Sequence, residues 1–292
     1  MLECVINVSE GRDPEVIAAA AAAAGAACLL DVHRDAHHHR SVLTLAGPVD
    51  AVEAAARAVT TVGVRRIDLR RHDGAHPRLG AVDVVPFVPL AGEAIGVAVG
   101  ARDRFLAWAA AELGVPCFAY GPERTLPEVR RTAFVTLAPD AGPPQPHPMA
   151  GAICVGARLL LVAYNLWLAP GVPVAEARRI AAAVRSPHVR ALGLDIGGQA
   201  QVSCNLVAPS AVGPADVYDA VAAVLPVERA ELVGLVPQTV LAVIPGERWP
   251  ALDLDAGRTI EARLAEAGLL RPRPPGGGSA TAGGAAGGAP AR

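Results

Sequence analysis

The chain has 292 residues, of which 52% are hydrophobic, which is enough material for one large or two ordinary globular domains. Its 26 basic and 28 acidic residues give a net charge of −2, which argues against a general attraction to nucleic acid or to an anionic membrane. We therefore expect small molecules as its partners. No residue is lysine, so an arginine gains weight as a functional candidate only from its position.

Cysteine usage points to a reducing compartment. The five cysteines are odd in number, widely spaced and mostly set in apolar runs, with no CxxC pair. This pattern favours free, buried thiols. The sequence has neither a signal-peptide pattern nor an apolar run of about 18 residues, so we expect a cytoplasmic protein without a membrane span.

The first half of the chain alternates strand and helix patterns in the order β-α-β-β-α-β. The helix after the first strand should begin at Asp13-Pro14-Glu15, which supplies an N-cap, a first-turn proline and a first-turn acid. The expected elements are strand Leu2–Val8, a helix to Ala24, strands Ala27–Val32 and Ser41–Leu45, helix Val49–Val62 and strand Ala81–Leu90. A helix over 101–114 and a strand over 115–120 are additions to this unit.

The second half repeats the same order. Its expected elements are strand Leu159–Leu168, helix Val174–Val184, strands Val189–Ile196 and Gln201–Val207, helix Ala215–Leu225 and strand Glu231–Val236. The fold class is therefore α+β, with two tandem ferredoxin-like (βαββαβ) subdomains, each a mostly antiparallel sheet with helices on one face. We place the subdomains at 1–151 and 152–270, with a cleft between them. Residues 271–292 have the composition of a disordered Gly/Ala/Pro tail.

The stretch from Arg71 to Phe87 contains the densest group of reactive side chains. Imidazoles, guanidiniums and carboxylates alternate there with Gly74, Pro77 and Gly80, which predicts a loop. Because a rigid scaffold can aim loop side chains at a substrate, we interpret this stretch as an active-site loop. A solvated connection is the alternative.

Many separated motifs resemble, in order, the formiminotransferase domain of the glutamate formimidoyltransferase family. The resemblance spans about residues 2 to 245. It is carried by Glu3-Cys4-Val5, Asn7, Ser9-Glu10-Gly11-Arg12, Leu30-Asp31-Val32, His76-Pro77-Arg78-Leu79-Gly80-Ala81, Asp83-Val84, Pro86-Phe87, Ala138-Pro139-Asp140, Val155-Gly156-Ala157-Arg158, Ala163-Tyr164-Asn165, Gln201-Val202-Ser203, Asn205 and Val233-Gly234-Leu235-Val236-Pro237.

The resemblance implies a pair of ferredoxin-like subdomains and transfer of the formimino group of N-formimino-L-glutamate to N5 of tetrahydrofolate, in histidine breakdown. It implies that His76 is the catalytic imidazole, and that tetrahydrofolate is a co-substrate. The folate-contacting segment of the family falls on Gly142, Pro143, Pro144, Gln145, Pro146, His147, Pro148, Met149, Ala150 and Gly151. Three positions depart from the family pattern, because His33 replaces a usual acid, and His37 and His39 replace a usual Asp and Asn.

The chemistry of such a transfer suits one imidazole near neutrality. N5 must lose a proton, a tetrahedral adduct forms, and the departing glutamate nitrogen is protonated. We predict that His76 serves both steps; a histidine that only bonds its own loop is the alternative. Arg78 is a candidate for binding a substrate carboxylate through two parallel hydrogen bonds, but an ion pair with Asp83 or Asp73 would explain it nearly as well.

Several weaker candidates could face the cleft from strands or strand ends, and a structural hydrogen bond is at least as good an explanation for each. They are His72, Arg158, Asn165 and Gln201, of which Arg158 and Asn165 are taken as substrate-binding. Asn7, Glu10 and Gly11 follow the first strand near a helix N-terminus that could hold an anion, although helix capping explains them equally well.

The histidines His33, His37, His38 and His39 suggest a metal site, but their spacing is not a recognised one. We expect no metal. The leading hypothesis is a transferase that acts as a homodimer, with a separate cyclodeaminase as a possible partner, because little more than a tail follows residue 270. Transfer of formyl instead of formimino and a non-catalytic folate- or metal-binding module are the alternatives.

Overall fold

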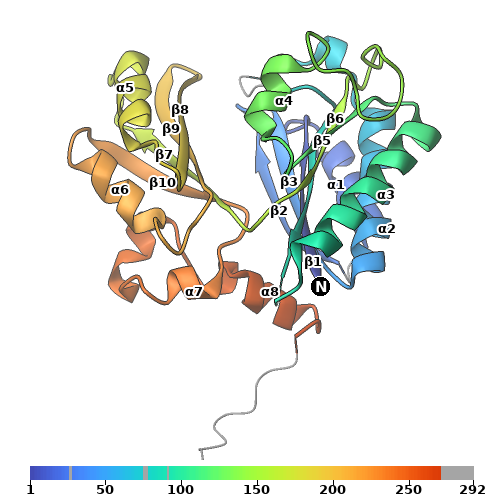
Figure 1. The fold of residues 1–292 in the computed structure, drawn as a ribbon. Helices are drawn as coiled ribbons and strands as arrows, with labels where there is room; N and C mark the ends of the chain where they lie inside the picture. Colours follow the sequence, from blue (N-terminus) through green and yellow to red (C-terminus); the bar gives the residue numbers. More distant parts are fainter. Residues whose placement is uncertain (26–27, 75–77, 91, 271–292) are drawn as a thin grey trace, which may run out of the picture.

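The structure is a computed structural model that describes residues 1–25, 28–74, 78–90 and 92–270. It contains two β-sheets whose open faces point toward each other, while helices cover the outer faces (Figure 1). The catalytic prediction for His76 and the prediction of a disordered tail over 271–292 lie outside the described residues.

The first half builds a ferredoxin-like unit from the N-terminus. Its elements are β1 (Leu2–Val8), α1 (Pro14–Ala24), β2 (Leu29–Asp35), β3 (Arg40–Gly47), α2 (Val49–Arg66) and β4 (Val82–Pro89). The strands lie in the order β2-β3-β1-β4, and each neighbouring pair is antiparallel. Helix α1 begins as predicted, since the Asp13 side chain accepts hydrogen bonds from the backbone N–H groups of Glu15 and Val16.

Further elements extend this first sheet. They are the 3₁₀ turn Leu69–Arg71, α3 (Ile95–Leu113), β5 (Cys117–Tyr120), α4 (Leu126–Thr132) and β6 (Ile153–Ala157). Strand β6 runs parallel between β4 and β5, so the first sheet has six strands. The sequence predicts that the second subdomain begins at 152, but Ile153–Ala157 forms β6 of the first sheet. In the structure the chain passes between the sheets from Ala157 to Val162.

The second half repeats the topology with four strands. Its elements are β7 (Val162–Leu168), α5 (Val174–Val184), β8 (Val189–Ile196), β9 (Gln199–Leu206), α6 (Pro214–Ala222) and β10 (Val227–Val233). The order β10-β7-β9-β8 is antiparallel throughout. Both halves thus have the predicted split β-α-β arrangement, and the predicted fold class is confirmed.

The chain then returns to the first half. After α7 (Gln238–Leu241) and three 3₁₀ turns (Gly246–Arg248, Pro250–Leu252, Ala256–Arg258), α8 (Ile260–Glu266) packs Ile260 and Leu264 against Leu30 and Ala46 of the first sheet. Helices α7 and α8 lie beneath the space between the two sheets (Figure 1). This apolar contact ties the two halves together at one end.

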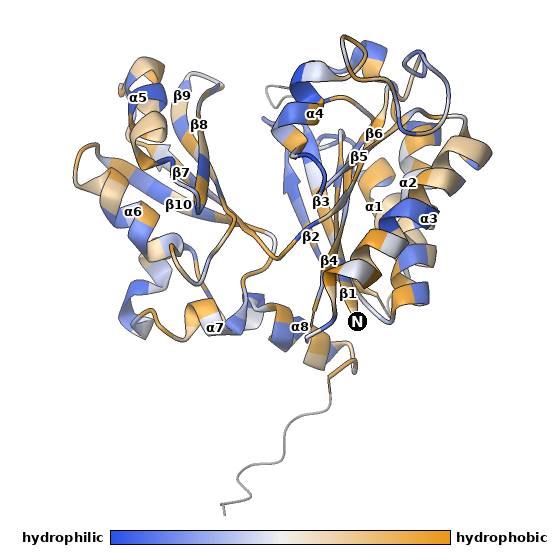
Figure 2. Cartoon of the chain, in the orientation of Figure 1, coloured by the Kyte–Doolittle hydropathy of each residue, from blue (hydrophilic) through white to orange (hydrophobic). Residues whose placement is uncertain are grey.

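Each half buries its own apolar core between its sheet and its outer helices. Two of the four edge strands, β2 and β10, carry hydrophilic stretches, drawn blue in Figure 2, as expected for strands with one unpaired edge. The five cysteines are free and buried, which confirms the prediction for the thiols. Within the described ranges, no helix combines the length and the apolar character needed to cross a bilayer.

Candidate active site

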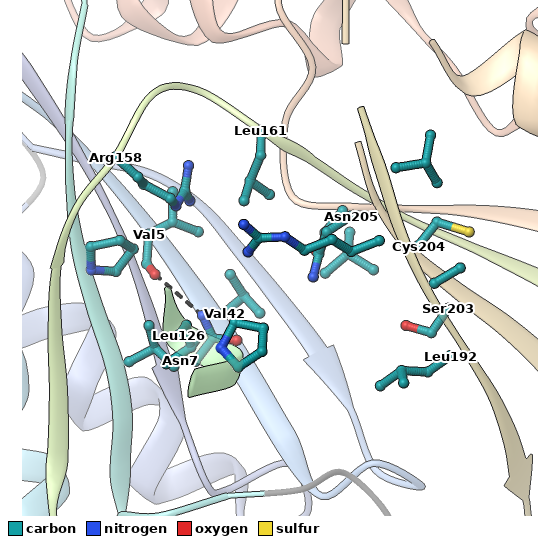
Figure 3. Close-up of a pocket in the computed structure, with 18 of the residues that line it drawn as sticks. Val5, Asn7, Val42, Leu126, Arg158, Leu161, Leu192, Ser203, Cys204 and Asn205 are labelled. Atoms are coloured by element: carbon teal, nitrogen blue, oxygen red, sulfur yellow. Dashed lines mark hydrogen bonds between the residues drawn. The ribbon is translucent and has the colours of Figure 1, made fainter. Parts of the chain in front are cut away.

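The two sheets enclose a cavity of about 830 Å³ between their open faces. Figure 3 shows Val5, Asn7 and Val42 of the first half on one side of this cavity and side chains of the second half on the other. A cavity of this size lies within the range typical of small-molecule sites. The predicted cleft is therefore present.

Strand alternation decides which side chains reach the cavity. On β1 the odd-numbered residues Glu3, Val5 and Asn7 line it, while even-numbered neighbours such as Cys4 lie in the core. Register continues this face onto β3, where Thr44 pairs with Val5. Each of these strands is therefore buried on both faces, one against helices and the other against the cavity.

The cavity lining is strongly basic. Among the described residues that line it, six are arginines and one is acidic. The arginines come from both halves: Arg40, Arg130, Arg131, Arg158, Arg185 and Arg190. Opposed walls of one sign focus the field in a cavity, so this lining favours ligands that carry negative charge.

The acidic residue is Glu3, whose side chain is almost fully buried. Burial raises the pKa of Glu3 to about 7, Arg158 opposes the shift and Glu261 adds to it. Near this carboxyl, burial also raises the pKa of the Tyr120 phenol, and Arg158 again opposes. Glu3 is consequently able to hold or release a proton close to neutral pH.

Gly156 makes room for the Tyr120 ring. A Cβ atom at residue 156 would lie 2.1 Å from the Tyr120 Cζ atom. Because this glycine belongs to the segment before Arg158, the small residue lets the aromatic ring and the guanidinium occupy the same part of the cavity wall.

At one end of the first sheet, three connections meet around the predicted active-site loop. Hydrogen bonds of Arg12, which follows β1, join these three connections. Arg12 Nη1 donates to Asp73 Oδ1 of the loop at 2.6 Å, and Arg12 Nε donates to Ala36 O of the β2–β3 turn at 3.0 Å. Ser9 Oγ donates to Gly80 O at 2.8 Å. The polar stretch that the sequence identified is thus built into the sheet end on both sides of residues 75–77.

Two stacked imidazoles anchor this loop. The rings of His39 and His72 lie 4.1 Å apart, and His72 Nε2 lies 2.9 Å from His39 O. The Gly74 backbone N–H donates to His72 Nδ1 at 3.1 Å, so Nδ1 is an acceptor and Nε2 carries the proton. Burial lowers the pKa of His72, in agreement with this neutral ring.

The His39 ring is also held in its neutral form. The Gly11 backbone N–H donates to His39 Nδ1 at 3.1 Å, while Glu10 Oε1 lies 3.4 Å from the same nitrogen. Burial lowers the pKa of His39, and Glu10 opposes this. The closer Gly11 contact and the burial together favour the uncharged ring. His39 therefore serves as a packing and hydrogen-bonding partner of His72.

Asp83 connects the loop to the cavity wall. Its carboxylate accepts hydrogen bonds from the Leu79 backbone N–H at 2.6 Å and from Arg130. Arg78 donates to Gly74 O, across residues 75–77. Burial lowers the pKa of Arg78, which Asp83 opposes.

The segment Gly142–Gly151 packs directly against the same loop. Leu69 N donates to Met149 O and Ala81 N to Ala150 O, both at 2.9 Å, and Gly80 forms a bridge with Gly151. The loop and the predicted folate segment are therefore neighbours. None of the residues from 142 to 151 lines the large cavity itself.

The cluster of four histidines does not converge on one point. His33 Nε2 lies 3.4 Å from Glu231 Oε1, and His38 Nδ1 lies 2.8 Å from Asp35 Oδ2. His37 approaches Gly197 of the second half, while His39 stacks on His72 as described. In the part of the chain that the structure describes, no group of three or more His, Cys, Asp or Glu side chains is arranged to hold a metal ion.

His33 instead joins the two halves. Its partner Glu231 on β10 also accepts hydrogen bonds from Trp167 Nε1 at 2.8 Å and Asn165 Nδ2 at 3.2 Å. Burial favours the neutral carboxyl, but these hydrogen bonds and His33 outweigh it and hold the pKa of Glu231 at about 2. His33 thus faces an ionised acid across the subdomain boundary.

The sequence-predicted residues divide into three groups. Arg158 and Asn165 line the cavity, while His72 and Arg78 lie in the neighbouring loop. Gln201 is fully buried, and neither of its amide atoms has a hydrogen-bond partner among the residues that the structure describes. The five other cavity arginines were not predicted from the sequence. For Arg40, the alternation Arg40-x-Val42-x-Thr44 was the available signal.

The first 158 residues match the model of the formiminotransferase domain, N-terminal subdomain. The chain is 32% identical to glutamate formimidoyltransferase of Thermoplasma acidophilum, over 91% of this chain and 98% of that protein. It is 35% identical to glutamate formimidoyltransferase of Streptococcus pyogenes, over 71% and 77% respectively. It is also 36% identical to the formimidoyltransferase-cyclodeaminase of Gallus gallus, over 82% of this chain but only 50% of that protein, so it spans about half the length of such relatives. The chain belongs to the formiminotransferase family.

Proposed function

We propose that this chain transfers the formimino group of N-formimino-L-glutamate to N5 of tetrahydrofolate. The names of the Thermoplasma and Streptococcus relatives support this activity. The observation that carries the proposal is the arginine-lined cavity between the two sheets, whose Arg130 binds Asp83 at the end of the active-site loop. Both substrates bear glutamate carboxylates, which suit such a lining.

The size of the cavity supports two substrates at once. About 830 Å³ approaches the upper end of the range for small-molecule sites, which suits a reduced folate and an amino-acid donor side by side. Bringing the two reactants together in one enclosed space turns a bimolecular reaction into an effectively unimolecular one.

His76 is the proposed proton-transfer residue. In the transfer, N5 of the pterin attacks the formimino carbon, and His76 removes the N5 proton as a tetrahedral adduct forms. His76 then returns a proton to the glutamate nitrogen as the C–N bond to the donor breaks. His72, held neutral beside Gly74, would keep the flanking backbone in place.

The remaining assignments follow from what each residue can bind. Arg78 is proposed as a carboxylate-binding residue beside the loop, and Arg158 and Asn165 as substrate contacts in the cavity. The segment Gly142–Gly151 is proposed to contact the folate, because its prolines reduce the entropy cost of forming a platform for a flat pterin.

The test is the transfer reaction itself. Purified protein with tetrahydrofolate should release glutamate from N-formimino-L-glutamate, and His76→Ala should lower kcat by at least about 100-fold with the fold intact. His188→Ala, which changes an exposed histidine in the second half, is the matched control and should keep full activity. Wild-type rates in His76→Ala would refute the catalytic assignment. Release from N-formyl-L-glutamate alone would establish formyl transfer, and folate binding without turnover would establish a binding module.

We also propose a homodimer in the cytoplasm, with a separate cyclodeaminase processing the product. Sedimentation of the purified chain tests the dimer, and a monomer at assay concentration would refute it. The cyclodeaminase follows from the chemistry of the product, because a formimino group on N5 must lose ammonia before the carbon can be used further.

A further inference from the structure

Arg40 occupies a distinctive position in the cavity. It is the first residue of β3 and directly follows His39, the residue that stacks on His72 of the active-site loop. Strand alternation places Arg40 on the same face as Val42 and Thr44, and all three line the cavity. The side chain therefore lines the cavity at the end of β3 that lies next to His39 and His72.

The guanidinium of Arg40 is charged, and its surroundings among the described residues are unusual for a cation. Burial lowers its pKa, while the nearby carboxylates of Asp35, Asp83 and Glu231 oppose this shift; Asp35 pairs in register with Arg40 on the neighbouring strand. A guanidinium remains protonated under such a shift. Throughout residues 1–25, 28–74, 78–90 and 92–270, no hydrogen bond or ion pair of this side chain is found. An enclosed charge without a partner is costly unless a ligand supplies one.

The three nearby acids are each engaged elsewhere. Asp35 accepts hydrogen bonds from the backbone N–H groups of His37 and His38, both at 2.8 Å, and pairs with the His38 ring. Asp83 binds Arg130 and the Leu79 N–H, and Glu231 binds Trp167 and Asn165. The donors of Arg40 are consequently left for an incoming anion.

Other arginines of the cavity differ from Arg40 in this respect. Arg158 donates to Leu159 O at 3.0 Å, and Arg185 to Ala191 O at 2.8 Å. Arg131 and Arg190 are exposed to solvent. Arg40 thus combines enclosure, a full set of unused donors and proximity to the loop.

Building on the proposed function, we propose that Arg40 binds the α-carboxylate of the amino-acid donor and thereby determines donor specificity. A guanidinium pairs with a planar carboxylate through two parallel hydrogen bonds. The α-carboxylate is attached to the same carbon as the nitrogen that carries the formimino group, so fixing this carboxylate fixes the reacting nitrogen. The glutamate tail of the folate is at the opposite end of that molecule from N5, so it lies away from the loop.

The test compares donors and variants. For the wild type, replacing the donor α-carboxylate by a carboxamide should lower kcat/KM on the order of 10- to 100-fold, since hydrogen bonds to charged groups have that effect. Arg40→Gln should show the same loss with the normal donor and no further loss with the α-carboxamide donor. The KM of Arg40→Gln for tetrahydrofolate should stay within about twofold of the wild-type value. Replacing the γ-carboxylate of the donor by a carboxamide should lower kcat/KM by the same factor in the wild type and in Arg40→Gln.

Arg34→Gln is the matched control. Arg34 lies on β2 of the same hairpin, pairs with Ser41 and is exposed outside the cavity. Its loss should therefore leave kcat/KM for both substrates unchanged. Arg40→Lys keeps the positive charge but loses the two parallel N–H donors of the guanidinium. Its kcat/KM for the normal donor should lie between the values of the wild type and Arg40→Gln. Retained discrimination between acid and α-carboxamide donors in Arg40→Gln would overturn the proposal, as would a selective rise in the KM for tetrahydrofolate.

A binding measurement separates this proposal from the proposed function. Calorimetry with L-glutamate, the released product, requires no turnover. Binding to wild type and Arg34→Gln but at least 10-fold weaker binding to Arg40→Gln would support the carboxylate site even if no donor reacts. Equal binding to wild type and Arg40→Gln, or no binding to the wild type, would refute it even if the transfer reaction is confirmed.

Discussion

The buried carboxyl of Glu3 gives a quantitative prediction about stability. Its pKa rises from 4.5 to about 7 on folding, mainly because burial disfavours the charged form. The folded state therefore binds the Glu3 proton more tightly than the unfolded state does. The cost is absent below pH 4.5, grows as the pH rises, and is complete above about pH 7. Since each pKa unit corresponds to about 1.4 kcal/mol, the full cost is about 3 kcal/mol.

Glu3→Gln removes this cost while keeping nearly the same shape. Urea unfolding at pH 8 should give a free energy of unfolding up to about 3 kcal/mol higher for the variant than for the wild type, and the difference should be near zero at pH 4.5. Glu247→Gln, at an exposed position, is the control and should show no such pH dependence. A stability difference for Glu3→Gln that is equal at both pH values would refute the reasoning, because packing alone would then explain it.

Two further predictions follow from the neighbourhood of the cavity. Gly156→Ala should lower the free energy of unfolding by about 1–3 kcal/mol, because the new Cβ would overlap the Tyr120 ring. Gly96→Ala in α3, where no atom lies near the new Cβ, is the control and should not destabilise the protein. Equal effects of the two substitutions in urea unfolding would contradict the overlap. The lowered pKa of His72 means that the folded state holds this ring neutral, so its contribution to stability is complete above pH 6.5 and is lost as the pH falls through the folded value. When the pH is lowered from 7.5 to 5, the melting temperature should decrease less for His72→Gln than for the wild type. Identical decreases would contradict this role of His72.

The fold was predictable because its signals are local. Asp13 and Pro14 mark the start of α1, and the sequences of β1, β3 and β9 show the two-residue period that is typical of strands. The element α4 was missed although Thr125 and Glu128 form a capping box that marks its start. Strand β6 was missed because it follows a proline-rich segment and is too short to show a clear period.

The candidate site was only partly predictable. The polar residues of the loop around His72 and Asp73 marked the loop as a candidate, although a solvated connection has a similar composition. The cavity arginines could not be distinguished, since every basic position of this chain outside the histidines is arginine and only the tertiary structure separates Arg40 from an exposed arginine such as Arg34. The bond between His33 and Glu231 joins residues almost 200 positions apart, which no local pattern reveals.

The positions of Glu3 and Arg40 show why the cavity retains two costly groups of opposite charge. Glu3 pairs in register with Ala46, which is six residues from Arg40 along β3, or roughly 20 Å in an extended strand. At this separation the two side chains do not form an ion pair, so neither relieves the burial cost of the other. Arg158 opposes the burial of Glu3, and Asp35, Asp83 and Glu231 oppose that of Arg40, but burial is the larger effect on both pKa values, so a ligand can stabilise each group further. A ligand set that places a carboxylate beside Arg40, next to the loop, and a hydrogen-bonding group near Glu3, at the other end, would satisfy both, and an elongated pair of reactants such as an amino-acid donor and a folate has this distribution of polar groups.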